Sequence, residues 1–212
     1  MPNPALTQVA GIGSARRRTP SRDVERALLT AAESVLVRDG MEGVTVRAVA
    51  AAAQVAPMGI YNRFGDKQGL ITALVIRSYE LLSEALAGVS ETEPLVRLKL
   101  MGEAYRDFGV RHPEHYRLIF QTVATADTKG DPGVARVARS TFEALTAQIL
   151  DAMVAGAIRP ADPRVVAQQI WCVIHGAVAL ELGNRLISSQ PAQSYTALLD
   201  LIISGLTSNS PD

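Results

Sequence analysis

The chain has 212 residues, 48% of them hydrophobic and 20% charged, and its formal net charge is zero. This composition excludes a disordered chain and does not favour a membrane-surface protein, and the length suits a small head with a larger body. The charge is unevenly placed, because residues 1–70 hold nine basic and six acidic residues whereas residues 71–212 hold twelve and fifteen. A net positive charge in the N-terminal part is expected of a segment that binds phosphate groups.

Residues 1–20 are rich in Pro, Gly, Ala and Ser, show no helical or strand period, and include three consecutive arginines, Arg16 to Arg18. We expect a flexible basic N-terminal arm. Such an arm either lies along a DNA backbone or minor groove or is a solvated tail, and the composition leaves both open.

Residues 21–66 predict three helices. The first has an apolar face at helical spacing, made by Val24, Leu28, Ala31, Val35 and Leu36. Gly40 ends this helix, Thr45 caps the second, and Pro57 opens a third that runs to about Phe64. Two short helices around a tight turn are typical of a helix-turn-helix, which sets its second helix into the major groove of DNA.

The start of the third helix suits entry into a groove. A recognition helix needs small or adaptable side chains there, because bulky ones hold its backbone away from a groove about 12 Å wide. Pro57, Met58 and Gly59 meet that need. A helix-interior glycine costs about 1 kcal/mol relative to alanine, which close approach to DNA explains. A tight helix crossing is the alternative explanation.

Other side chains around the motif are suited to DNA contact. Tyr61, Lys67 and the Thr45 hydroxyl are expected to meet phosphates. The candidates for base or backbone contact are Arg47, Asn62 and Arg63. Ile60 and Phe64 should belong to the core. The alternative is a solvated helical hairpin with ordinary surface charges.

Residues 67–212 predict a helical body. Asp66 caps a helix from about Lys67 to Ala87 that joins head and body. Further helices are expected at about Pro94–Arg111, Pro113–Thr125, Pro132–Ala155, Pro163–Leu186 and Ser194–Thr207. Two of these starts pair an aspartate cap with a proline, and Ser194 is the expected cap of the last helix. No segment has a strand period, so the chain is all-α.

The last two predicted helices carry more apolar surface than a small body can cover. The segment Ile170–Leu182 is apolar nearly all round, and the last helix has apolar residues on more than one face, namely Leu198, Leu199, Leu201, Ile202, Ile203 and Leu206. We expect these two helices to pack against the equivalent helices of a second subunit, forming a four-helix bundle in a homodimer. A thick monomer core is the alternative.

Large side chains between the predicted body helices are candidates for a ligand cavity: Met101, Tyr105, Phe108, Tyr116, Phe120, Phe142, Met153, Trp171 and His175. Each also suits a plain core. Trp171 and His175 lie one helical turn apart, which fits a core tryptophan beside a hydrogen-bonded histidine.

Catalysis and metal binding are poorly supported. Cys172 and His175 are three residues apart, but both lie mid-helix in an apolar run without oxyanion donors. His112 and His115 flank Pro113, which disrupts the helix that would aim both rings at one metal. We expect no catalytic residue, no metal and no cofactor.

The expected location is cytoplasmic. Cys172 is the only cysteine, so no intramolecular disulfide forms and a reducing compartment fits. No uninterrupted apolar run approaches the roughly 20 residues of a membrane span. The N-terminal arginines follow the weakly apolar start, the reverse of a signal peptide.

Residues 22 to 70 contain a set of small, apolar and polar residues at characteristic spacings, namely Ala31-Ala32, Leu36, Gly40, Val44-Thr45, Val49-Ala50, Ala53, Val55, Gly59, Ile60-Tyr61, Phe64, Lys67 and Leu70. In these residues the segment resembles the DNA-binding domain of TetR-type transcriptional regulators. The resemblance implies operator contact by Thr45, Arg47, Pro57, Met58, Gly59, Tyr61, Asn62, Arg63 and Lys67, usually with repression. Two residues depart from the pattern: Gln54 replaces the common turn glycine, and Ala56 replaces the usual Ser or Thr cap of the recognition helix.

The body is similar to the WHG type of TetR C-terminal domain. Trp171, His175 and Gly176 supply its triplet, and Tyr105 to Phe120 resemble its other signature. The resemblance implies a helical dimer with an internal cavity. The resulting hypothesis is a ligand-responsive repressor that binds a near-palindromic double-stranded operator and is released by a small, mostly apolar effector. A dimeric small-molecule carrier that does not act through DNA is the alternative.

Overall fold

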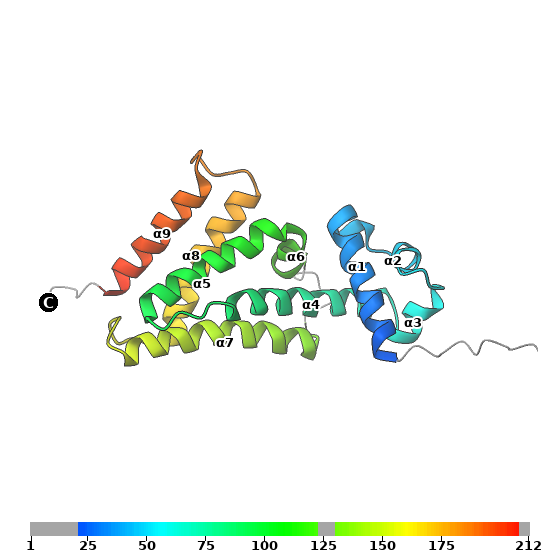
Figure 1. The fold of residues 1–212 in the computed structure, drawn as a ribbon, viewed down its shortest axis with the longest axis horizontal. Coiled ribbons are helices and arrows are strands. Elements are labelled where there is room, and N and C mark those ends of the chain that lie inside the picture. The colour runs from blue at the N-terminus through cyan, green and yellow to red at the C-terminus, as the bar shows by residue number, and fades with distance from the viewer. Residues whose placement is uncertain (1–20, 123–129, 208–212) are drawn as a thin grey trace, which may run out of the picture.

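The computed structural model describes residues 21–122 and 130–207. Within these ranges the chain forms nine α-helices and one short π-helical segment, with no strand, so the all-α prediction is confirmed. A small head of three helices lies at one end of the molecule and a larger helical body at the other (Figure 1). The predicted N-terminal arm lies outside the described residues.

The head consists of α1 (Ser21–Gly43), α2 (Val46–Ala52) and α3 (Met58–Phe64). The apolar face predicted for α1 forms the core of the head, with Leu28, Val35 and Leu36 fully buried. Gly40 adopts φ 69°, a left-handed conformation that glycine tolerates, and it interrupts the helical backbone. The predicted end at Gly40 is therefore a kink, after which one more turn continues to Gly43.

The turn between α3 and α4 (Lys67–Ala87) fixes the angle at which the head meets the body. Gly65 has φ 80°, and the Asp66 carboxylate caps α4 by accepting from the Gly69 N–H at 2.8 Å. A Cβ atom on Gly69 would lie 1.9 Å from the Phe64 carbonyl oxygen, so no larger residue fits there without a backbone shift. The end of α3 and the start of α4 are thus held against each other.

The body contains α5 (Pro94–Arg111), α6 (Pro113–Arg117), the π-helical segment η1 (Leu118–Thr122), α7 (Pro132–Val154), α8 (Pro163–Leu182) and α9 (Pro191–Thr207). The predictions for α4, α5 and α7 are close to these bounds. The helix predicted from Pro113 instead changes to a π-helix at Leu118, and π segments often accompany functional sites.

Two predicted bounds near the C-terminus are wrong. α8 ends at Leu182, because Asn184 turns the chain into the left-handed region with φ 52°. α9 begins at Pro191, whose fixed φ suits a first helical turn. Ser194 is therefore inside the helix, where its N–H donates to the Gln190 carbonyl, and it is not the cap.

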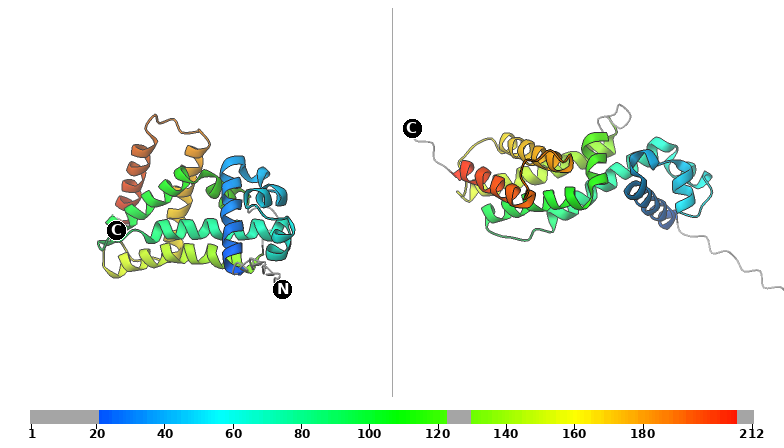
Figure 2. Two further views of the ribbon diagram at one scale, coloured as in Figure 1. Left: turned by 45° about the vertical axis from the view of Figure 1, so that its right-hand side comes forward. Right: turned by 90° about the horizontal axis from the view of Figure 1, so that it is seen from above.

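α4 runs from the head into the body beside α7, while α8 and α9 lie side by side at the far end from the head (Figures 1 and 2). One hydrophobic core extends from α1 through α4 to α8 and α9. Arg77 of α4 adds an ion pair to Glu33 of α1 at 3.2 Å. α4 is thus the helix that connects the core of the head with the core of the body.

α8 is long and apolar enough, by length and composition, to cross a membrane, with 22% of its most apolar window buried. This finding does not contradict the expectation about uninterrupted apolar runs, because Gln168, Gln169 and His175 interrupt this helix. One such helix is weak evidence for a membrane span, because helices of soluble proteins pass the same test. α8 packs against α5, α7 and α9 in this structure.

Candidate nucleic-acid interface and ligand cavity

The helix-turn-helix exposes most of the residues predicted to meet DNA. Thr45, Arg47, Pro57, Met58, Tyr61, Asn62 and Lys67 are exposed, and Gly59 is half-buried. Met58 is 63% exposed and Tyr61 45%, which is unusual for side chains of their size on so small a head. Ile60 is fully buried and Phe64 packs against the core, as predicted. The exposed set is therefore a surface of α2 and α3 that internal packing leaves uncovered.

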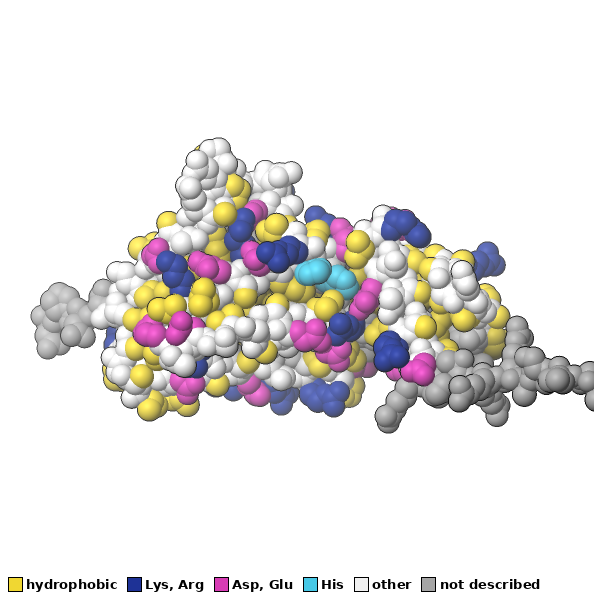
Figure 3. All heavy atoms as spheres, in the orientation of Figure 1, with side chains coloured by type: hydrophobic (Ala, Val, Ile, Leu, Met, Phe, Trp, Pro, Cys, Tyr) yellow, Lys and Arg dark blue, Asp and Glu magenta, His cyan; other side chains and the backbone are white. Residues whose placement is uncertain are grey.

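The charge of this surface favours an anionic partner. Residues 43–65 contain two arginines, Arg47 and Arg63, and no acidic residue. On the face shown in Figure 3, basic and acidic side chains are interspersed over the body. Mixed charges of this kind screen one another, whereas an acid-free motif leaves its helix N-termini and the exposed Arg47 available to phosphate.

The N-terminal ends of both helices fit the predicted roles. Thr45 Oγ1 accepts from the Ala48 N–H at 3.1 Å, so this residue caps α2, and its hydroxyl proton remains able to meet a phosphate oxygen. At Gly59 an added Cβ would meet only the Val55 side chain, at an ordinary distance of 3.6 Å or more. No described helix crosses there, so tight internal packing does not explain this glycine.

Arg63 differs from the other candidates. It is half-buried and pairs with Glu25 of α1 at 3.6 Å. A guanidinium engaged in this way holds α3 against α1, and it would reach DNA only by leaving that partner. The structure thus gives Arg63 a positioning role within the head that the sequence pattern does not reveal.

Both departures from the family pattern have structural consequences. Gln54 occupies the turn with φ 56°, the left-handed region that costs a residue with a Cβ atom about 1 kcal/mol or more. The start of α3 has no side-chain cap, and the Gly59 N–H bonds instead to the Ala56 carbonyl at 2.8 Å. The recognition helix is therefore held less firmly than α2 or α4.

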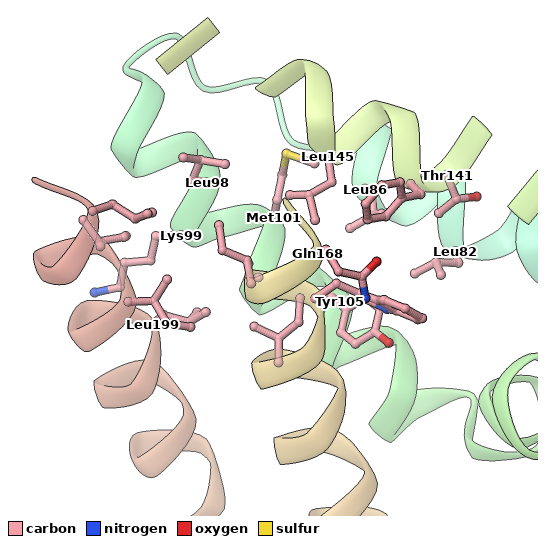
Figure 4. Close-up of a pocket in the computed structure, with 18 of the residues that line it drawn as sticks. Leu82, Leu86, Leu98, Lys99, Met101, Tyr105, Thr141, Leu145, Gln168 and Leu199 are labelled. Carbon is pink, nitrogen blue, oxygen red and sulfur yellow. The ribbon is translucent and has the colours of Figure 1, made fainter. Parts of the chain in front are cut away.

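The body contains a partly open cavity of ≈ 220 Å³ between α4, α5, η1, α7, α8 and α9. Figure 4 shows apolar side chains from several of these helices converging on it. Five of the predicted residues line it, namely Met101, Tyr105, Phe120, Phe142 and Trp171. The rest of the wall includes Tyr79, Leu82, Gln168 and Leu199, whose helical spacing in the sequence is that of ordinary core residues.

Phe108, Tyr116, Met153 and His175 do not line the cavity, although the sequence made them candidates. Phe108 and Tyr116 are buried in the core. His175 lies behind the wall, where its Nδ1 is within hydrogen-bond distance of the hydroxyls of Tyr105, at 3.1 Å, and Tyr116, at 2.8 Å, and the Tyr116 hydroxyl donates to the His175 carbonyl at 3.2 Å. The expectation of a hydrogen-bonded histidine beside a core tryptophan is confirmed by this arrangement and by ring contact between His175 and Trp171.

Burial determines the protonation of His175 and of the tyrosine hydroxyls around it. Burial lowers the pKa of His175, so the neutral imidazole is favoured. Burial also raises the pKa of Tyr116 to about 12, with a smaller opposing effect of the hydrogen bond to Tyr105. The group is therefore uncharged near neutral pH.

A second buried histidine lies at the junction of head and body. Ser78 of α4 donates its hydroxyl proton to the Leu74 carbonyl, so the ring Nδ1–H of His115 donates to the Ser78 oxygen at 2.8 Å. Burial lowers the pKa of His115 to about 4, assisted by His112 and Arg77. Cys172 is exposed and its sulfur accepts from Gln168, so it has a different partner from His175.

This geometry defines a class of protein: an all-α chain with an exposed helix-turn-helix and a cavity-bearing body is a DNA-binding transcriptional regulator. Residues 28–74 match a family model described as bacterial regulatory proteins of the tetR family, and residues 98–203 match one described as a tetracyclin repressor-like C-terminal domain. The chain belongs to the TetR family. Its WHG-type assignment within the family stays a prediction.

Solved structures share the whole architecture. A protein of unknown function from Rhodococcus sp. RHA1 superposes with TM-score 0.80 at 25% identity, covering 92% of this chain and 99% of its own. A TetR-family transcriptional regulator from Pectobacterium atrosepticum gives 0.72 at 20% identity, covering 92% and 100%. The fatty acid degradation regulator FadR from Bacillus halodurans gives 0.71 at 16%, covering 86% and 99%. A search of curated proteins found no significant match.

Proposed function

We propose that this protein is a ligand-responsive repressor that binds a near-palindromic operator as a homodimer. Each subunit sets the start of α3, from Pro57, into a major groove, and a small, mostly apolar effector in the body releases the DNA. The proposal divides the chain into a head of residues 21–66 and a body of residues 67–212. The observation that carries it is the exposed, acid-free surface of α2 and α3 on a head joined by α4 to a cavity.

The contacts that support this proposal separate positioning from sequence recognition. Tyr61, Lys67 and the Thr45 hydroxyl face solvent around α3 and suit phosphate oxygens. Arg47 and Asn62 are exposed on the same motif and carry the donors and acceptors that base edges require. Replacing members of the first group should weaken binding to all sequences alike, whereas changes in the second should alter sequence preference.

The proposed homodimer rests on the outer faces of α8 and α9. Val165, Val173 and Leu180 are exposed along α8, and Leu201 of α9 is 70% exposed. Such an apolar surface on two adjacent helices suits an isologous contact in which both pack against their mates. A dimer also places two heads at a fixed spacing, as two half-sites require.

The proposed release mechanism depends on α4. The first residue of α4, Lys67, is one of the residues predicted to contact DNA, and Tyr79, Leu82 and Leu86 of the same helix line the cavity. A ligand that favours one position of α4 shifts the equilibrium between head spacings by the difference in its affinity for the two states. Spacing that no longer matches successive major grooves lowers operator affinity.

A salt series tests the DNA-binding proposal. Purified protein is titrated into a fluorescein-labelled mixed-sequence duplex at 50 to 400 mM salt, and anisotropy gives the affinity. A DNA reader loses roughly 0.9 log units of affinity per phosphate contact for each log unit of salt. A chain that shows no binding at the lowest salt, or binding without a salt slope, would support the carrier alternative and contradict the proposal.

A further inference from the structure

The polar groups at the cavity wall are mostly committed to partners within the protein. The Tyr105 hydroxyl meets His175, Thr141 donates to the Val137 carbonyl, and Gln168 donates to the Cys172 sulfur. The ammonium group of Lys99 is paired with Asp200 of α9. A ligand therefore has few polar groups left to meet.

Tyr79 of α4 is the exception. Its side chain is only 9% exposed and lines the cavity. Within the described part of the chain, its hydroxyl neither donates to nor accepts from another group. The oxygen is not among the fully buried unpartnered atoms, so a small molecule can reach it, and a ligand acceptor there gains a hydrogen bond that no described protein group provides.

The cavity has no free charge to offer a ligand. Lys99 is the only charged residue in its described lining, and it is already neutralised by Asp200. An ionised ligand would lose its hydration without gaining an opposite charge, which is strongly unfavourable. A neutral ligand meets no such penalty.

Aromatic rings dominate one part of the wall. Phe120 contacts Tyr79, Tyr105 and Trp171 at ring-centroid distances of 6.2 to 6.4 Å, in edge-on or tilted geometry. Rings arranged in this way favour a further flat ring among them. A dry cavity of about 150 Å³ accommodates benzene, so the ≈ 220 Å³ here suits a molecule of about two fused rings.

We infer that the cavity selects uncharged, flat, largely apolar ligands that carry one hydrogen-bond acceptor, and that the Tyr79 hydroxyl donates to this acceptor. The inference rests on the proposed function, because it names the chemical class of the effector and the residue that distinguishes it. Tyr79 is on the helix that leads to the head. The hydrogen bond to the ligand acceptor therefore forms on α4, the helix proposed to transmit the effect of ligand binding to the head.

Three probes with the same ring system test the inference in the full-length protein without DNA. 2-Acetylnaphthalene carries a neutral acceptor, 2-ethylnaphthalene carries none, and 2-naphthoate is charged. Isothermal titration calorimetry gives each affinity, and quenching of Trp171, the only tryptophan, reports that the probe occupies the cavity. Failure to bind an operator does not affect these titrations, so the two proposals fail independently.

We expect the ketone to bind about three- to tenfold more tightly than the ethyl compound, the range of one net hydrogen bond. The carboxylate should bind more weakly than both. Tyr79→Phe should remove the preference for the ketone and leave the affinity for 2-ethylnaphthalene unchanged, which also shows that the variant is folded. Tyr195→Phe is the matched control, because Tyr195 is also a buried tyrosine but does not line the cavity and its hydroxyl is already bonded to the Gly102 carbonyl, so this variant should keep the preference.

Three results would overturn the inference. The first is tightest binding of 2-naphthoate, which would show that a cation serves the ligand. The second is an unchanged ketone preference in Tyr79→Phe, which would assign recognition to another group. The third is failure of all three probes to bind the wild-type protein or to quench Trp171.

Discussion

In the head, most residues assigned to DNA contact are exposed and lack internal partners, whereas in the body the residues around the cavity are mostly buried or half-buried and their polar groups are largely paired. The head also contains local weaknesses, since Gln54 is left-handed and α3 has no side-chain cap. In the body, by contrast, His175 is hydrogen-bonded to the hydroxyls of Tyr105 and Tyr116 behind the cavity wall. The head therefore has unpaired surface groups that DNA can engage, whereas the body pairs most of its own polar groups and leaves room for one ligand.

The largest expected effect on operator affinity comes from disrupting the proposed dimer interface in the body, which separates the two heads. Val173→Asp with Leu201→Asp places charges on the exposed apolar faces of α8 and α9. We expect a monomer by sedimentation equilibrium and an operator affinity at least about 100-fold lower, because two linked sites gain this much over one. Unchanged helicity by circular dichroism is the control. A double variant that remains dimeric would place the interface elsewhere.

The buried histidine at the junction predicts a loss of stability in acid. The pKa of His115 is about 4 in the folded chain and ordinarily about 6.5 when unfolded. Between these values the unfolded chain binds the extra proton, so the free energy of unfolding should fall by about 2 kcal/mol as pH drops from 6.5 to 4. The contribution is complete above pH 6.5 and absent below pH 4.

His115→Gln should flatten this part of the stability profile, measured by urea unfolding across the pH range. His112→Gln is the matched control, because the exposed His112 lies three residues away and makes only a smaller contribution than burial to the lowered pKa of His115, so this variant should flatten the profile much less. Equal flattening in both variants, or in neither, would contradict the assignment to His115.

Removing two proposed phosphate contacts tests the exposed surface of the head. Tyr61→Phe with Lys67→Ala should weaken operator binding about tenfold and reduce the magnitude of the salt slope by about one. The loss should be equal for matched and mismatched operator sequences. Arg38→Ala provides a control, because Arg38 is exposed on α1 and paired with Asp39. Unchanged affinity in the double variant would show that these two roles are wrong.

The smallest effect concerns the strained turn before the recognition helix. Gln54→Gly removes the Cβ atom at φ 56° and should stabilise the protein by up to about 1 kcal/mol, part of the gain being offset by the entropy of glycine. Gln54→Ala keeps the Cβ atom and should bring little gain. Differential scanning calorimetry measures both, and a lower Tm for the glycine variant would argue against strain at this position.

The sequence predicted the head in more detail than the body for a physical reason. Thr45, Asp66 and the apolar face of α1 act through local spacing and capping, which leave a direct pattern in the chain. A cavity is space that side chains fail to fill, and its wall residues have the same spacing as core residues. Tyr79 and Tyr116 were therefore indistinguishable in the sequence, although only the first lines the cavity.

The early end of α8 and the pairing of Arg63 with Glu25 also escaped prediction. The first depends on a left-handed asparagine at position 184, a conformation that asparagine accepts but does not require. The second depends on how α3 packs against α1, which is a tertiary property. Neither leaves a signal in the periodicity of the chain.

The central claim, that two recognition helices enter successive major grooves, is tested most directly by selecting bound sites from random duplex DNA with the purified protein at low salt. Sequencing of the retained DNA should show two inverted half-sites whose centres lie about 10 base pairs apart, or a multiple of that spacing. Retained DNA without any shared sequence, a single half-site without a mate, or no retained DNA would contradict the account.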